Sequence, residues 1–298
     1  MRVFVVGVGS IGHRHLANAR ELGCEAAGGR LPEAEAFAPD ALVIASPTSD
    51  HLDALRWAVE RGVHAFVEKP VASSSAGVAD TLSAAEAAGL TVGVGYNLRF
   101  HPALEAIRDA VAEGRIGRLI SARAEVGQHL SEWHPHEDYR RSYAARAELG
   151  GGALMTLSHE LDYIRWISGE VESITGIVAH VSSLEVDVDD VAELVCRHSN
   201  GSVSSIHMDF LDRVYNRRSR WIGEEGTIAW EWAKPVQLGP PGATLWDDPT
   251  FELASTYKDA LGDFLDAVAR ARAPRCSGRE ALRVLELCEA VSGAQGLS

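Results

Sequence analysis

Met1 to Gly12 read MRVFVVGVGSIG, an apolar run rich in β-branched residues that ends in three spaced glycines. The pattern predicts a strand, a tight turn and a helix that continues to about Arg20. In such a turn Gly7 permits the bend, Gly9 lets the backbone approach a pyrophosphate, and Gly12 allows the helix to pack closely on the strand. The stretch therefore predicts a dinucleotide site; a glycine turn without a ligand and a methyltransferase are the alternatives.

Length and charge limit the classes of function. The chain has 298 residues and 46% hydrophobic content, which fits two globular domains. Its formal net charge of -14, without a run of lysines and arginines, argues against binding to nucleic acid or to an anionic membrane. We expect a small-molecule ligand, and we interpret the excess of acidic residues as a solubility feature.

Cysteine usage and hydropathy indicate the compartment. Cys24, Cys196, Cys276 and Cys288 are scattered, without a CxxC pair or zinc spacing, so we expect buried thiols and no metal. The chain begins directly with a core strand, and no apolar run approaches about 18 residues. We therefore expect a cytoplasmic protein without a membrane span.

The first part of the chain alternates predicted strands and helices. The strands are expected at 41–48, 63–67 and 91–96, and the helices at 51–61 and 75–88. Such alternation predicts a parallel, doubly wound α/β sheet with ligands outside the carboxyl ends of its strands. A weak second strand at 24–30 precedes residues 31–39, a stretch too short for a full crossover helix.

The pattern then changes to period-2 segments separated by turns such as Asn200-Gly201, which predicts a mainly antiparallel open sheet. The segments are 119–126, 173–181, 191–197, 202–210, 218–222 and 227–232. One strong helix, from Gly152 or Ala153 to Ile167, interrupts them. We predict a Rossmann domain at 1–117 and an α+β domain at 118–298, with helices in 255–290 packing back on the first domain.

Lys69 follows a predicted buried strand and precedes Pro70, which biases it toward an extended conformation. Its ammonium would then project from the carboxyl edge of the sheet. A lysine there can polarise a substrate oxygen or exchange its proton. A solvated lysine in a loop is the alternative.

A second cluster lies where Gly150-Gly151-Gly152 lead into the helix of the second domain. Helical spacing places Thr156, His159 and either Glu160 or Tyr163 on one face, and His159 and Asp162 also face together. A histidine beside a carboxylate can act as a general acid or base near neutral pH. A satisfied packing histidine is the alternative.

Together these motifs resemble the glucose-fructose oxidoreductase, inositol dehydrogenase and rhizopine-catabolism family (Gfo/Idh/MocA). The resemblance covers most of the chain and rests on residues 7–12 with His15, 46–48 with His51, 68–70, 95–102 and 150–162. It implies an N-terminal Rossmann domain, an open antiparallel sheet that forms the interface of a homodimer or homotetramer, and NAD or NADP hydride chemistry on sugars and inositols.

The resemblance also implies site residues. Lys69 would be the catalytic lysine and His159 the catalytic histidine. The expected cofactor contacts are Gly7, Gly9, Ser10, Ile11, Gly12, Arg30, Ser46, Pro47, Thr48, His51, Glu68, Lys69 and Asn97. Two features depart from the family pattern: Thr156, or Met155, holds the place of its usual aspartate, and the stretch after Gly29 lacks the usual second helix.

The end of the second strand bears on the choice of cofactor. It reads Gly28-Gly29-Arg30, without the acid that normally binds the ribose 2′-hydroxyl of NAD. An arginine there suits a 2′-phosphate, so the sequence favours NADP. The alternative is that Arg30 is solvated or stacks on adenine, and that NAD binds.

Residues 128–143 combine aromatic and polar side chains suited to an oxygenated ring, and two adjacent arginines, Arg140 and Arg141, could hold a phosphate or carboxylate. His129, His134 and His136 have no trusted metal-site spacing. The residues expected near substrate are Lys69, Arg99, Trp133, Tyr139, Tyr143, Thr156 and His159.

The predicted function is reversible hydride transfer between nicotinamide and a secondary alcohol or ketone. A sugar-like substrate is expected: a nucleotide sugar, an amino sugar or an inositol. The alternatives are an imine or enamine reductase on the same fold and a cofactor-binding sensor without turnover.

Overall fold

The computed structural model describes residues 1–133, 136–240 and 242–293. Its elements form two compact units. The first contains Met1–Arg99 and Glu252–Glu286, and the second contains Phe100–Phe251 and the chain from Leu287 onward. The first division falls after Arg99, ahead of the boundary at residue 117 predicted from the sequence. Within the described residues, no helix is long and apolar enough to cross a membrane.

The first unit is built on a five-stranded sheet with the order β2-β1-β3-β4-β5. Its strands are β1 (Arg2–Val6), β2 (Glu25–Gly29), β3 (Ala41–Ile44), β4 (His64–Val67) and β5 (Val92–Val94). Each neighbouring pair is parallel, and all four residues of β3 are buried. The predicted doubly wound parallel sheet is confirmed. The strand order reverses direction beside β1, the position where such sheets bind ligands.

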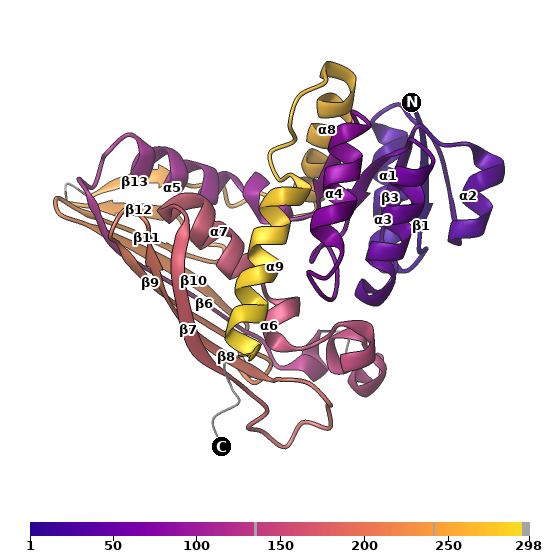
Figure 1. Cartoon of the computed structure of the whole chain (residues 1–298). Coiled ribbons are helices and arrows are strands. Elements are labelled where there is room, and N and C mark those ends of the chain that lie inside the picture. The colour runs from indigo at the N-terminus through magenta and orange to yellow at the C-terminus, as the bar shows by residue number, and fades with distance from the viewer. Residues whose placement is uncertain (134–135, 241, 294–298) are drawn as a thin grey trace. The chain divides into compact units, whose positions relative to one another are not determined.

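Helices of the first unit accompany these strands (Figure 1). Consecutive strands are connected by α1 (Ser10–Glu21), α2 (Leu31–Phe37), α3 (His51–Glu60) and α4 (Val78–Ala87), and α8 (Ala254–Arg270) returns from the second half of the chain. The prediction of no full helix in residues 31–39 is partly wrong, because α2 forms over seven residues with Pro32 in its first turn. A proline is tolerated there because the first N–H groups of a helix have no partner within it. Helix α8 contacts α1 and β4.

The second unit contains an eight-stranded sheet with the order β13-β12-β11-β10-β6-β9-β8-β7. The strands are β6 (Leu119–Gly127), β7 (Val171–Ala179), β8 (Val191–His198), β9 (Val203–Asp209), β10 (Asn216–Gly223), β11 (Thr227–Glu231), β12 (Val236–Gly239) and β13 (Ala243–Trp246). Among the strand pairs of the described residues, only β6 and β9 are parallel. The predicted open, mainly antiparallel sheet is confirmed, and β12 and β13 extend it beyond the predicted segments.

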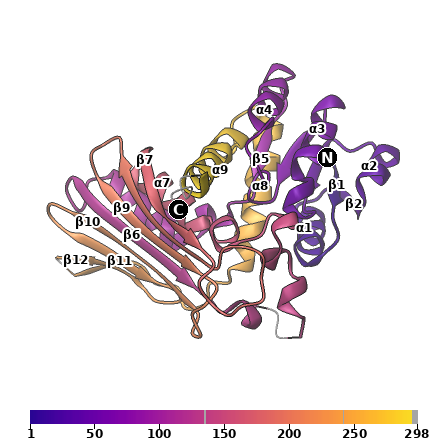
Figure 2. The same cartoon turned by 60° about the horizontal axis from the view of Figure 1, so that its bottom comes forward.

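The helices α5 (Pro102–Ala112), α6 (Ala153–Thr156) and α7 (His159–Ser168) pack on this sheet. Figures 1 and 2 show α7 running along one face of the strands. Buried and exposed residues alternate along β8, so the sheet has one packed face and one open face. The single helix predicted from 152 or 153 to 167 is wrong: Leu157 leaves helical geometry, with ψ at 16°, and separates α6 from α7.

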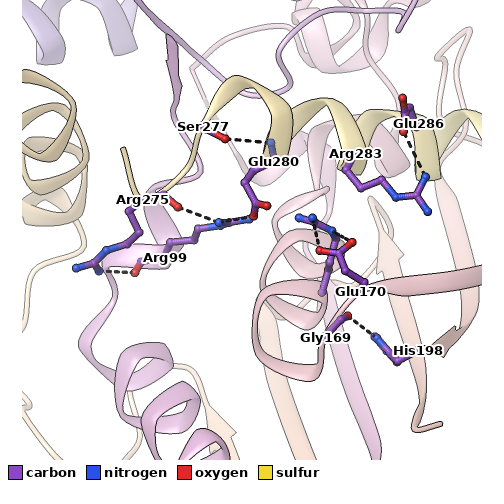
Figure 3. Close-up of polar contacts among 10 residues, drawn as sticks. Arg99, Gly169, Glu170, His198, Arg275, Ser277, Glu280, Arg283 and Glu286 are labelled. Atoms are coloured by element: carbon purple, nitrogen blue, oxygen red, sulfur yellow. Dashed lines mark hydrogen bonds and ion pairs between the residues drawn. The ribbon is translucent and has the colours of Figure 1, made fainter. Parts of the chain in front are cut away.

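Arg99 joins the end of the parallel sheet to the start of α9 (Gly278–Gly293). Its side chain is 1% exposed, and Nη1 lies 3.0 Å from the Glu280 carboxylate and 3.1 Å from the Arg275 carbonyl oxygen. Arg275 in turn donates to the Arg99 carbonyl oxygen at 3.0 Å. Figure 3 shows these contacts, together with the more exposed pair of Arg283 and Glu286 on α9.

We expect Arg99→Met to destabilise the protein by about 2 to 4 kcal/mol, because it leaves the Glu280 carboxylate and the Arg275 carbonyl without their shared cation. The matched control, Arg283→Met, removes a more exposed pair and should cost less than about 1 kcal/mol. Urea unfolding followed by circular dichroism measures both. Equal midpoints for the two variants would contradict the structural role of Arg99.

Candidate active site

The glycine turn after β1 is shaped by close backbone contacts. Gly7 has a φ of +86°, and a Cβ built on it would lie 2.6 Å from the Ala45 carbonyl oxygen. A Cβ on Gly12 would overlap the Gly7 carbonyl oxygen, so glycine is needed for α1 to pack against the turn. A Cβ on Gly9 would meet nothing within 4 Å. The backbone at Gly9 is therefore open to a ligand.

The start of α1 suits an anion. Ser10 and Ile11 form the beginning of the helix, Gly9 is its N-cap, and its first turn contains no acidic side chain. Unpaired N–H groups and the helix dipole give this end partial positive charge. Together with the open backbone of Gly9, these features fit the pyrophosphate of a dinucleotide.

A carboxylate lies at the end of β2, where the sequence analysis expected none. Glu33, in the first turn of α2, accepts a hydrogen bond from Arg30 Nε at 3.2 Å. A Cβ on Gly29 would overlap this carboxylate, which therefore lies over the end of the strand. The Arg30 side chain is 90% exposed. The sequence analysis missed Glu33 because α2, which turns it back toward the strand, was not predicted.

The segment after β3 contains the expected cofactor contacts Ser46, Pro47, Thr48 and His51. Thr48 is buried and starts a short 3₁₀ helix, Thr48–Asp50. His51 Nδ1 lies 2.8 Å from the Pro70 carbonyl oxygen, and Nε2 lies 3.0 Å from that of Ser46. Burial lowers the pKa of His51, so the neutral ring donates to one of these carbonyls at a time. This histidine connects the end of β3 to the turn after β4.

That turn contains Lys69, which comes two residues after the end of β4 and is half-buried. Strands β1, β3 and β4 are parallel neighbours, so Lys69 lies at the same sheet edge as the glycine turn. The Lys69–Pro70 peptide bond is cis. The preceding Glu68 accepts a hydrogen bond from Lys69 N at 3.3 Å and lies 2.6 Å from His15 Nε2. Glu68, expected to contact the cofactor, is thus engaged inside the first unit.

Asn97 and Arg99, also expected in the site, have partners within the first unit. Asn97 Nδ2 donates to Thr256 Oγ1 at 2.7 Å, and both residues are buried. This hydrogen bond ties the 3₁₀ helix Asn97–Phe100 to α8. Arg99 makes the contacts with Arg275 and Glu280 described above. Both side chains support the fold around the sheet edge.

In the second unit, a glycine lets an acidic side chain approach the start of α6. Gly152 has a φ of +105°, and a Cβ there would overlap the Asp189 carboxylate. Asp189 Oδ2 accepts from Leu154 N at 2.8 Å, and Ala153 N donates to the Asp189 carbonyl oxygen at 3.0 Å. Burial raises the pKa of Asp189. Asp189 lies far along the chain from the glycine run, and the sequence analysis did not identify it.

The helix break separates the two residues singled out on this segment. Thr156 is the last residue of α6 and is buried, whereas His159 is the first residue of α7 and is half-buried. Glu160, considered as a neighbour of His159, forms a buried ion pair with Arg217, its Oε1 2.8 Å from Nε. Burial and the charge of Glu160 raise the pKa of Tyr163 well above its usual value. These two side chains belong to the packed face of the sheet.

The residues after β6 form a series of short 3₁₀ turns. Trp133 donates to the Gln128 carbonyl oxygen at 3.2 Å, and Tyr139 OH accepts from the backbone N–H of Glu185 at 3.3 Å. Tyr143 is 41% exposed. His134, the middle histidine of this segment, lies outside the described residues. Among those that are described, no group of three or more histidine, cysteine or acidic side chains could hold a metal ion.

Two family models match consecutive parts of the chain. Residues 30–96 match the oxidoreductase family with an NAD-binding Rossmann fold, and residues 104–229 match the C-terminal domain of the GFO/IDH/MocA family. Together they span the parallel sheet from β3 to β5 and the second sheet as far as β11. Both matches indicate the family that the sequence motifs resemble.

Curated relatives and solved structures agree with these matches. The chain is 28% identical over 266 residues to the uncharacterized oxidoreductase YrbE of Bacillus subtilis, covering 84% of this chain and 74% of that protein. It is 26% identical over 264 residues to inositol 2-dehydrogenase of Rhizobium meliloti, covering 84% and 77%. The WlbA dehydrogenase of Bordetella pertussis, solved with NADH and UDP-GlcNAcA, has the same fold, with a TM-score of 0.83, 21% identity and coverage of 99% and 95%.

The glycine turn fits a dinucleotide. Each of the two units has the kind of sheet expected for this family, and part of each matches a model of the family. The chain belongs to the Gfo/Idh/MocA family of NAD-binding oxidoreductases.

Proposed function

We propose that the protein transfers a hydride between a nicotinamide dinucleotide and a secondary alcohol or ketone of a sugar-like substrate. The observation that carries this proposal is the position of Lys69 at the sheet edge that also holds the glycine turn. Ligands of doubly wound sheets bind at that edge. A half-buried lysine at that edge supports a role in binding and polarising a substrate oxygen.

Each proposed residue has a defined task. Lys69 binds the reacting oxygen and exchanges its proton, and His159 acts as a second proton-exchanging group. Thr156 supplies a hydroxyl in place of the aspartate usual in the family, and it orients substrate without adding charge. The nicotinamide, when bound, supplies or accepts the hydride.

The proposed substrate class is an oxygenated ring: a nucleotide sugar, an amino sugar or an inositol. The names of the relatives, which include an inositol 2-dehydrogenase and an enzyme solved with UDP-GlcNAcA, support it. The exposed Tyr143 and the segment with Trp133 and Tyr139 offer aromatic and hydroxyl groups for such a ring. Arg140 already pairs with Asp138 and Glu185, which leaves Arg141 as the better candidate for an anionic substituent.

For the cofactor we propose NADP, because the exposed guanidinium of Arg30 at the end of β2 suits a 2′-phosphate. Glu33 supports NAD as the second candidate, since its carboxylate over Gly29 can accept a hydrogen bond from a ribose 2′-hydroxyl. The same carboxylate would repel a 2′-phosphate. The choice of cofactor thus depends on whether Arg30 pairs with the Glu33 carboxylate or with a 2′-phosphate of the bound dinucleotide.

We also propose that copies of the chain associate through the open face of the eight-stranded sheet. Ile177, Val195 and Val203 are exposed by 63%, 52% and 45%. Their strands β7, β8 and β9 are neighbours. Exposed apolar groups on adjacent strands are typical of an interaction surface. The neighbouring part of this face is a charged depression of about 630 Å³ that includes His207 and Arg218.

Lys69→Met should lower turnover by about 100-fold or more, because the proton of the substrate hydroxyl loses its exchange partner. Binding of the reduced dinucleotide should change by less than about threefold. A panel of nucleotide sugars, amino sugars, inositols and imines, assayed by nicotinamide absorbance, measures turnover. Lys258→Met is the matched control, because Lys258 makes an exposed ion pair with Glu21. Unchanged turnover in Lys69→Met would end the catalytic assignment, and dinucleotide binding without turnover of any compound would favour a sensor.

Arg30→Ala should weaken NADPH binding by about 10-fold or more and leave NADH binding nearly unchanged, because it removes the cation for a 2′-phosphate. Glu33→Ala should weaken NADH binding only. Energy transfer from tryptophan to the reduced nicotinamide measures both dissociation constants. Tighter binding of NADH than of NADPH by the wild-type chain would overturn the NADP preference and assign the ribose contact to Glu33.

Val195→Glu should dissociate the assembly, because it places a charge among apolar side chains of the open face. Val214→Glu is the control: Val214 is 75% exposed and lies between β9 and β10, outside the strands. Light scattering after size-exclusion chromatography gives the mass of each variant. A wild-type monomer, or equal masses for both variants and the wild type, would contradict association through this face.

A further inference from the structure

The carboxylate of Glu68 is held inside the first unit by groups from two parts of the chain, α1 and the turn after β4. Its side chain is 12% exposed, and Oε1 lies 2.6 Å from Nε2 of His15, a residue with no solvent exposure on α1. The other oxygen accepts from Lys69 N at 3.3 Å. Burial opposes ionisation, but hydrogen bonding to His15 and attraction to His15 and Lys69 outweigh it and lower the pKa of Glu68. The carboxylate is therefore charged at neutral pH.

The neighbouring strand leaves room for this carboxylate. Val67 and Val94 are partners in the parallel register of β4 and β5, so Glu68 and Gly95 follow at the next position. A Cβ on Gly95 would lie 3.0 Å from three carboxyl atoms of Glu68. A side chain at position 95 would therefore crowd the carboxylate of Glu68. The absence of a side chain at Gly95, just after β5, thus makes room for the Glu68 carboxylate.

The imidazole of His15 is fixed by aromatic neighbours. Its ring centroid lies 5.4 Å from that of Phe66 and 6.4 Å from that of Tyr257, both in edge-on geometry. His15 lies on the same helix as the glycine turn, a little more than one turn after Ser10. These ring contacts and the hydrogen bond from Nε2 to Glu68 together hold the imidazole in place.

We propose that His15 is a positioning residue for Lys69 that acts through Glu68: the histidine holds the carboxylate, and the carboxylate fixes the backbone and the charge of Lys69. The proposal rests on the proposed function only in naming Lys69 as the reacting group. It couples the helix that binds the dinucleotide to the lysine that handles the substrate proton. Among the described groups, His15 from α1, Lys69 on its own segment and His51 from α3 interact electrostatically with Glu68.

The chain allows a direct test without substrate, because its lysines are only Lys69, Lys234 and Lys258. Reductive ¹³C-methylation gives each lysine a separate NMR signal, and Lys69→Arg assigns the one for Lys69. In Glu68→Gln the titration midpoint of this signal should fall by about one pH unit or more, because the ammonium loses an adjacent negative charge. The signals of Lys234 and Lys258 should not move. Glu86→Gln, which removes an exposed carboxylate of the same unit, is the matched control.

The role of His15 is tested by removing and by restoring its donor. In His15→Leu the Lys69 signal should acquire an inflection between about pH 5 and 8, because Glu68 without its partner then takes up a proton in that range. His15→Gln keeps an N–H donor and should suppress this inflection. Thermal midpoints within a few degrees of wild type show that the variants are folded. The proposal would be overturned if the titration midpoint of the Lys69 signal did not change in folded Glu68→Gln. It would also be overturned if this signal showed no inflection between about pH 5 and 8 in folded His15→Leu.

Turnover provides a second readout. With any compound that the wild-type enzyme converts, His15→Leu should lower kcat by about 10-fold with little change in KM, and His15→Gln should restore most of it. The double variant His15→Leu/Glu68→Gln should be no slower than Glu68→Gln alone, because both act through one contact. Additive losses would contradict the shared contact. Full turnover in Lys69→Met would refute the proposed function, while the NMR titration would still decide whether the coupling exists.

Discussion

The close approach of α1 to the end of β1 is the constraint on which the first unit depends. Gly12 has no side chain, and this lets the helix lie against the carbonyl of Gly7. The approach fixes where the first N–H groups of α1 point and therefore where a pyrophosphate can bind. It also fixes His15, one turn further along, within 2.6 Å of Glu68. The same backbone contact thus sets the start of α1 and the position of His15 beside Glu68, the residue before Lys69.

The register of the parallel strands carries this geometry across the sheet. Ile44 pairs with Val67 and Val67 with Val94, so the residues that follow these strands leave the sheet at one edge. His51 then joins the end of β3 to the turn after β4 through the carbonyls of Ser46 and Pro70. The half-buried lysine lies within a frame set by backbone contacts and buried side chains. Such a frame lowers the conformational cost of placing its ammonium.

The sequence predicts those features of the fold that depend on long periodic segments. The five parallel strands and six of the eight strands in the second sheet follow from hydrophobic patterning. The patterning misses β12 and β13, which are four residues each, because such short windows resemble a loop. It also misses the break between α6 and α7, since neither Leu157 nor Ser158 is a helix breaker. Glu33 and Asp189 were missed because only the folded chain brings them to the glycines they contact.

Buried charged residues show why a motif alone does not establish the function of a side chain. Arg99, Arg217 and Glu68 are all largely buried, and each has a partner more than fifty positions away in the chain. A sequence shows the charge but not the distant partner, so the pairing of Arg99 with Glu280 becomes visible only in the folded chain. A buried charge must be neutralised, and when partners within the fold supply this, the side chain serves stability. Glu68 differs from the other two in one respect, because its neighbour along the chain is the lysine at the ligand-binding edge. The ion pair that stabilises the fold there therefore also places a negative charge next to Lys69.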